Sequence, residues 1–164
     1  MFRATRWKWV LAAGLAVFGG TPTVGDDRTG ATTAAIHPPD GLKWTAGPPS
    51  LPAGAQIAVL EGDPTKPGPF VMRVKVPDGY KIPPHTHPKP ERVTVLAGRF
   101  HLGMGKKFDP KHATALTAGT YETWPAGMKR FVWTEGETVV QSHGDGPWTI
   151  EYLNPADDPR NQKK

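Results

Sequence analysis

Glycine and proline recur along the whole chain, and their frequency limits the folds that it can adopt. The 164 residues include 19 glycines and 19 prolines. Proline interrupts helix interiors because it has no N–H to donate, and glycine costs conformational entropy in any regular element. Long helices are therefore disfavoured, whereas short strands joined by turns are compatible with this composition. The sequence predicts an all-β domain.

Short runs of β-branched and aromatic residues between turn residues predict nine strands. These runs span residues 56–61, 70–76, 80–82, 92–97, 99–104, 119–124, 130–134, 137–143 and 148–153. The segment 110–116 would tolerate a helix, but it is too short to change the fold class. Strands at intervals of about 8–12 residues are typical of a sandwich or a closed barrel, not of an alternating βαβ sheet.

The N-terminal residues have the pattern of an export signal. Three basic residues precede an apolar run at 9–18, which is shorter than a membrane-spanning helix of about 20 residues. We therefore expect residues 1–25 to be a signal peptide, cleaved near Gly25 or alternatively after Ala35. The other alternative is an uncleaved membrane anchor. With cleavage, we expect a periplasmic or secreted protein that keeps no stable membrane span.

Three further regions are expected after the leader. Residues 26–40 are polar and have no apolar period, which predicts a flexible linker. Residues 41–154 contain all nine predicted strands and form the predicted folded domain. Residues 155–164 are polar and Pro-rich, and we expect them to leave the barrel as an extended tail.

Charge and cysteine content exclude two classes of function. The net charge of +5 falls to +2 without residues 1–25, which hold three basic residues and no acidic one. Apart from Lys163 and Lys164, no basic cluster remains, so we expect no nucleic-acid partner. The chain has no cysteine, which excludes thiolate chemistry. An exported protein without disulfides depends on its core, a metal or oligomerisation for stability.

Two histidines and a glutamate are the strongest candidates for a functional site. In a strand, residues i and i+2 point to the same face, so His85 and His87 project together. Glu91 follows a Pro-rich connection and shares a strand face with Val93 and Val95. Two imidazoles and a carboxylate inside an apolar barrel are suited to a divalent first-row metal.

This stretch resembles the first motif of the cupin superfamily, G-x5-H-x-H-x3,4-E-x6-G. Every defined position is matched, by Gly79, His85, His87, Glu91 and Gly98. The resemblance implies a cupin jelly-roll barrel, also called a double-stranded β-helix, and a divalent metal such as Mn, Fe, Ni or Zn. Small single-domain cupins commonly dimerise, so a homodimer is also implied.

The second cupin motif, G-x5-P-x-G-x2-H-x3-N, is matched only in part. Gly119, Pro125 and Gly127 agree with it. Arg130 stands at the position of the fourth metal ligand, a histidine, and Thr134 stands at the position of the final asparagine. An arginine has no lone pair for a metal and stays charged at ordinary pH.

Three arrangements of the pocket follow from Arg130. In the first, His143 replaces the missing ligand, with Gln141 on the same strand face. In the second, a site of three ligands persists, with water or substrate in the open positions. In the third, no metal binds, and Arg130 pairs with Glu91 as an internal charge substitute.

These arrangements lead to different functions. A metal site indicates an enzyme of the dioxygenase, isomerase or lyase type, acting on a small oxygenated molecule. The alternative is a non-catalytic module in which Arg130, with Lys129 as a further candidate, holds a carboxylate or sugar acid. Arg130, Gln141 and Tyr121 are the candidate substrate contacts of the pocket. A structural barrel with a collapsed pocket is the weakest hypothesis, since it has no need of three intact ligands.

Overall fold

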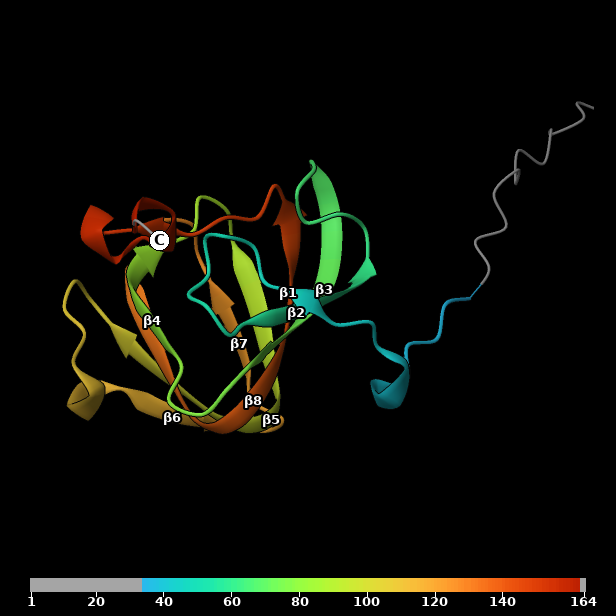
Figure 1. Cartoon of the computed structure of the whole chain (residues 1–164), viewed down its shortest axis with the longest axis horizontal. Coiled ribbons are helices and arrows are strands. Elements are labelled where there is room, and N and C mark those ends of the chain that lie inside the picture. Colours follow the sequence, from blue (N-terminus) through green and yellow to red (C-terminus); the bar gives the residue numbers. More distant parts are fainter. Residues whose placement is uncertain (1–33, 163–164) are drawn as a thin grey trace, which may run out of the picture. The chain divides into compact units, whose positions relative to one another are not determined.

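The computed structural model describes residues 34–162, and in this part of the chain nine strands form one antiparallel sheet (Figure 1). The strands are β1 (Thr45–Ala46), β2 (Gln56–Glu61), β3 (Gly68–Val76), β4 (Lys81–Thr86), β5 (Glu91–Met104), β6 (Thr114–Thr117), β7 (Tyr121–Trp124), β8 (Arg130–Gly146) and β9 (Glu151–Tyr152). Within residues 34–162, four single 3-10 turns lie at Pro39–Gly41, Pro110–His112, Pro155–Asp157 and Pro159–Asn161. The all-β prediction is confirmed.

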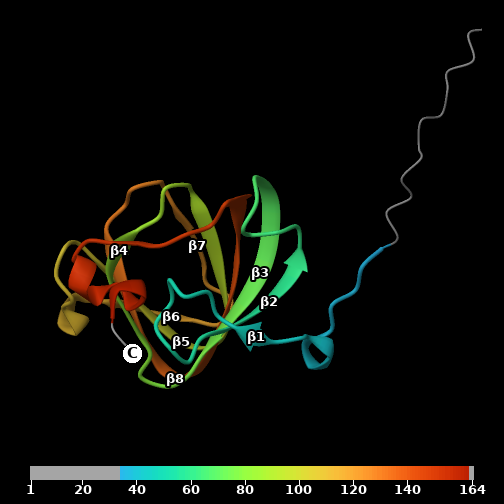
Figure 2. The ribbon, with the colours of Figure 1, turned by 45° about the horizontal axis from the view of Figure 1, so that its top comes forward.

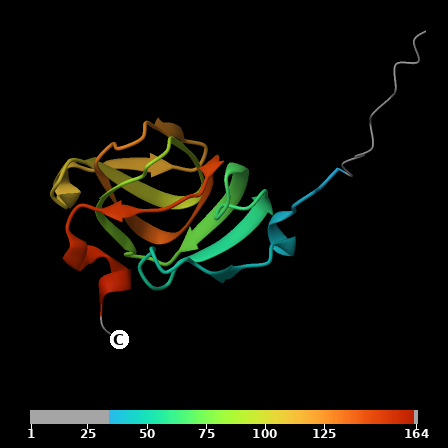
Figure 3. The same ribbon diagram turned by 90° about the horizontal axis from the view of Figure 1, so that it is seen from above.

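Two long strands, β5 and β8, hold the sheet together. They pair with each other along most of their length, and β8 also pairs with β3 and β4. Each was predicted as two separate strands, but both continue through a bend, at Gly98 in β5 and near Gly136 in β8. Because the two strands bend together, the sheet curls around a common interior, as expected for a jelly-roll barrel (Figures 2 and 3).

The remaining predictions agree with the structure to different degrees. The bounds of β2 are those predicted, whereas β4 is longer than predicted because Pro83 and Pro84 lie within it. The segment 110–116, expected to tolerate a helix, begins with a 3-10 turn and continues into β6. The tail is not extended: it forms two 3-10 turns, and Arg160 Nη2 donates to the carbonyl of Ile150 at 3.1 Å.

The predicted signal peptide at 1–25 and most of the predicted linker at 26–40 lie outside the described residues. Their bounds, and the domain limits at 41–154, stay predictions. Among residues 34–162, no helix has the length and apolar character needed to cross a membrane.

The barrel interior is built by alternate residues of the long strands. On β8, Val132 and Val140 are buried on the inner face, and on β5, Leu102 and Val95 lie opposite them. Apolar side chains from β3 and from the connecting segments, among them Leu51, Tyr80 and Ile150, complete the core. The interior is therefore mostly apolar, and the polar residues that enter it are few and stand out.

Gly98 connects the first cupin motif to the bend in β5. Its φ angle is +77°, and a Cβ at this position would overlap the carbonyl oxygen of Glu137 and lie 2.7 Å from the Cα of Thr138. Gly136 has a similar φ of +71°, but a Cβ there would meet no atom within 4 Å. A substitution at Gly136 therefore strains only the backbone, whereas a substitution at Gly98 also creates a steric overlap with β8.

We expect Gly136→Ala to cost about 1 kcal/mol of unfolding free energy, because only the left-handed backbone is strained. Gly98→Ala should cost roughly 1–3 kcal/mol more, because the β8 backbone must also move. Urea denaturation of both variants measures the difference. Equal losses would contradict the close approach of β5 and β8 at Gly98.

Candidate functional site

The three residues of the first motif meet inside the barrel. His85 lies near the end of β4, His87 follows that strand directly, and Glu91 begins β5. All three side chains are buried, and the imidazole rings of His85 and His87 lie 5.2 Å apart between centroids. The short Pro-rich connection from β4 to β5 is what brings the carboxylate back to the two imidazoles.

These residues line a cavity of about 60 Å³. Most of its wall is apolar, and the apolar and aromatic residues that line it are Leu51, Val74, Val76, Tyr80, Ile82, Val93, Phe100, Val132, Val140, Trp148 and Ile150. The polar residues in the wall are His85, His87, Glu91, Glu122, Arg130 and Ser142. A cavity of this size holds about four water molecules, or a ligand with few non-hydrogen atoms.

Arg130 enters this cavity and pairs with Glu91. Its Nη2 atom donates to Oε2 of Glu91, and the two side chains are only 5% and 7% exposed. Arg130 lies opposite His85 in the β4–β8 register, which aims it at the motif residues. Its guanidinium also lies over the ring of Trp124, 5.3 Å from the ring centroid. The fourth-ligand position is thus filled by a cation.

Two further donors bind the other carboxylate oxygen of Glu91. Ser142 Oγ and Trp148 Nε1 donate to Oε1 at 2.7 and 2.8 Å. His87 Nε2 lies 3.6 Å from Oε2. Both oxygens of Glu91 are therefore already engaged within the protein.

The protonation states follow from burial and from these contacts. Burial opposes ionisation of Glu91, but His87, Arg130 and the hydrogen bonds outweigh it and lower its pKa to about 2. Burial, together with His87 and Arg130, lowers the pKa of His85 to about 3. Burial also lowers the pKa of His87. At neutral pH the imidazoles are uncharged, and the charges of Arg130 and Glu91 cancel.

This arrangement does not fit a divalent metal held by His85, His87 and Glu91. A metal would have to compete with three donors for the carboxylate, and it would lie close to the charge of Arg130. Among the described residues, no group of three or more His, Cys, Asp or Glu side chains is arranged to hold a metal ion. The geometry corresponds to the third arrangement expected from the sequence, and metal binding by these residues stays a prediction.

The structure does not bring His143, Gln141 and Tyr121 to the cavity. Inward positions on β8 are even-numbered from Arg130 to Ser142, so residues 141 and 143 face outward. Gln141 accepts a hydrogen bond from Arg73 Nε at 3.3 Å. His143 stacks against Tyr121, which is 55% exposed, with 6.4 Å between ring centroids. The sequence analysis put Gln141 and His143 on one strand face correctly but assigned that face to the wrong side.

Three residues of the site were missed by the sequence analysis: Ser142, Trp148 and Glu122. Counting by two from Arg130 would have placed Ser142 inside. Trp148 was predicted to begin the strand 148–153, but it lies in the irregular connection between β8 and β9, where strand periodicity does not apply. Glu122 lies within the partial second motif, and both of its carboxylate oxygens are buried without a hydrogen-bond partner.

Comparison with known proteins agrees with this fold. The polyketide cyclase RemF from Streptomyces resistomycificus superposes with a TM-score of 0.61 at 16% identity, over 77% of this chain and 89% of RemF. KdgF from Halomonas sp. has a TM-score of 0.51 at 16% identity, over 76% of this chain and 98% of KdgF. An RmlC-like cupin from Shewanella frigidimarina has a TM-score of 0.51 at 11% identity, over 76% and 96%.

Sequence comparison is informative at the family level. None of the curated proteins matches the chain. The family model described as "Domain of unknown function (DUF4437)" matches residues 40–164, which include both motifs and the whole barrel. The chain therefore belongs to the DUF4437 family, and its fold is that of the cupins.

Proposed function

We propose that this protein binds a small molecule in its cupin cavity and uses the Arg130–Glu91 pair where cupins of the complete motif place a metal. The observation that carries the proposal is the position of Arg130. It stands at the fourth-ligand position of the motif, and its guanidinium binds Oε2 of Glu91, the carboxylate oxygen that would otherwise be available to a metal. An internal cation thus supplies the positive charge that balances Glu91.

The charges in the cavity favour a neutral ligand. The charge of Arg130 is matched by Glu91, and both imidazoles are uncharged, so no net positive charge is left to compensate an anion. Arg130 still has N–H groups beyond the one bound to Glu91. We therefore propose a small neutral oxygenated molecule, in place of the carboxylate or sugar acid considered from the sequence.

A metal-dependent enzyme of the dioxygenase, isomerase or lyase type is the second candidate. Two observations favour it: His85 and His87 are uncharged, as metal ligands must be, and His85 is oriented by a 2.8 Å contact between Nδ1 and the carbonyl of Pro83. Loading with Mn, Fe, Ni or Zn would require Arg130 to release Glu91.

The proposed location is outside the cytoplasm. Its support is the basic and apolar pattern of the first residues. We also propose a homodimer as the assembly, on the resemblance to small cupins.

Removal of Arg130 tests the charge pair through stability. Arg130→Met leaves the buried carboxylate of Glu91 without its counter-charge, so we expect a loss of about 3–5 kcal/mol in urea denaturation. Adding Glu91→Gln should restore much of this loss, because the unpaired charge disappears. The matched control is Arg99→Met, which breaks an exposed pair with Glu135 at 2.8 Å and should cost at most about 1 kcal/mol. Equal losses for Arg99→Met and Arg130→Met would contradict the proposal.

Binding of acetone and acetate tests the ligand class. The two probes have nearly the same shape and differ in charge, and both are small enough for a cavity of about 60 Å³. With chelator present, we expect amide shifts in an NMR titration to give a dissociation constant at least about tenfold lower for acetone than for acetate. Tighter binding of acetate, or no binding of acetone, would contradict the proposal, and binding only after metal addition would support the metalloenzyme.

Two variants locate the binding in that titration. Val140→Leu adds volume in the cavity wall and should weaken acetone binding. Gln141→Ala changes the adjacent residue, which faces outward and contacts Arg73, so acetone binding should be unchanged. The opposite pattern would place the ligand on the outer face of the barrel.

A further inference from the structure

We infer that Glu122 is a ligand-contacting residue of the cavity and that its carboxyl group donates a hydrogen bond to a carbonyl oxygen of the ligand. This inference rests on the proposed function and makes the ligand class more specific: a neutral molecule with a carbonyl group. Glu122 does not stand at a metal-ligand position of either cupin motif, and it takes no part in the Arg130–Glu91 pair.

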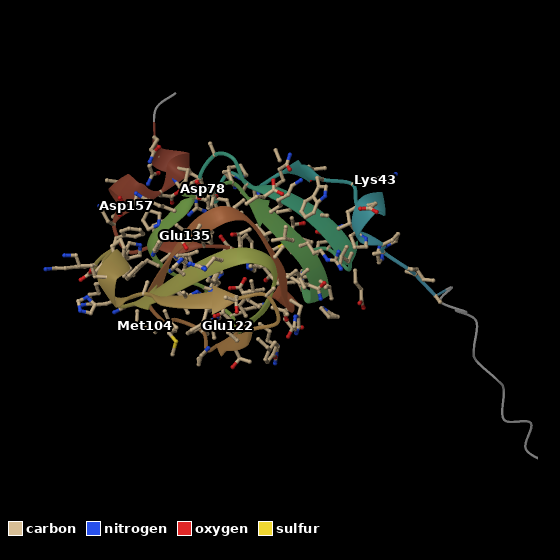
Figure 4. All side chains as sticks on the ribbon, turned by 90° about the horizontal axis from the view of Figure 1, so that it is seen from below. Lys43, Asp78, Met104, Glu122, Glu135 and Asp157 are labelled. Atoms are coloured by element: carbon tan, nitrogen blue, oxygen red, sulfur yellow. The ribbon has the colours of Figure 1, made fainter. Side chains whose placement is uncertain are left out.

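The position of Glu122 is fixed by the β5–β7 ladder. It lies opposite Val93, two positions from Trp124, which in turn lies opposite Glu91. Glu122 is labelled in Figure 4, on the side of the barrel where β7 runs along β5. Its side chain forms part of the cavity wall together with Val93 and Arg130.

The carboxyl group of Glu122 has no partner in the protein. Both of its oxygens are buried, and neither makes a hydrogen bond among the described residues. The indole Nε1 of Trp124, which lies on the same strand face, also lacks a hydrogen-bond partner there. Buried polar groups of this kind normally have partners, and the cavity is the side from which a small ligand can supply one.

The surroundings keep Glu122 mostly protonated below about pH 7. The charged groups that face it are Glu91 from β5 and Arg130 from β8, and Arg130 is already paired with Glu91. Burial, assisted by Glu91, raises the pKa of Glu122 to about 7. The charge of Arg130 and the nearby indole N–H of Trp124 oppose the shift, although the Trp124 N–H does not reach Glu122 with hydrogen-bond geometry. A protonated carboxyl is both a donor and an acceptor, whereas a carboxylate only accepts.

Acetone tests the donor role because its carbonyl oxygen only accepts hydrogen bonds. In the wild type, we expect the dissociation constant for acetone to rise about tenfold between about pH 6 and about pH 8, as Glu122 loses its proton. Glu122→Gln keeps an N–H donor at every pH, so its acetone binding should be independent of pH. Glu122→Leu has no donor and should bind weakly at both pH values.

The outcomes separate this inference from the proposed function. If the wild type binds acetone but Glu122→Leu binds equally well, or Glu122→Gln keeps the pH dependence, the role of Glu122 is wrong and the binding cavity stands. If the wild type does not bind acetone at either pH, the proposed function fails. Urea denaturation serves as the folding control, and Glu122→Leu should be no less stable than the wild type at about pH 8, since it removes a buried charge without a partner.

Discussion

The ion pair between Arg130 and Glu91 determines what the rest of the pocket can hold. A buried carboxylate is costly unless it is paired and hydrogen-bonded, and Glu91 receives donors from Arg130, Ser142 and Trp148. With its charge balanced internally, the pocket has no need of an external cation. The same guanidinium helps to keep His85 neutral. The electrostatics of the site therefore depend on a single residue at the start of β8.

The barrel topology makes this pair possible. Glu91 and Arg130 are far apart in the sequence, and each begins one of the two long strands. The start of β8 runs beside the end of β4, and the short connection after β4 leads directly to Glu91. The curl of the sheet then brings Glu91, at the start of β5, close to Arg130, at the start of β8. The fold thus positions the charges, and the apolar wall around them excludes water and strengthens their attraction.

Sequence reasoning predicted the fold and the central residues of the site. It did not predict correctly which face of β8 points into the barrel. The first motif and the placement of Arg130 led to the barrel and to a pair with Glu91 as one of three arrangements. The outward position of His143 could have been predicted by counting strand parity from Arg130. The contact of Trp148 with Glu91 could not, because it is set by the path of the irregular connection between β8 and β9 and not by strand periodicity. The burial of the Glu122 carboxyl group without a hydrogen-bond partner could not be predicted either, because it depends on how β7 packs on β5.

The metal content of the wild type and of Arg130→His is the most direct test of the account. Both proteins would be purified without an affinity tag, supplemented with Mn, Fe, Ni and Zn, and analysed by mass spectrometry of the elements. Arg130→His frees Glu91 and restores the motif histidine, so it should gain close to one metal per chain, while the wild type should stay far below that ratio. Adding Glu91→Gln to Arg130→His should remove the gain. A wild type that already holds about one metal per chain would contradict the claim that Arg130 takes the place of the metal.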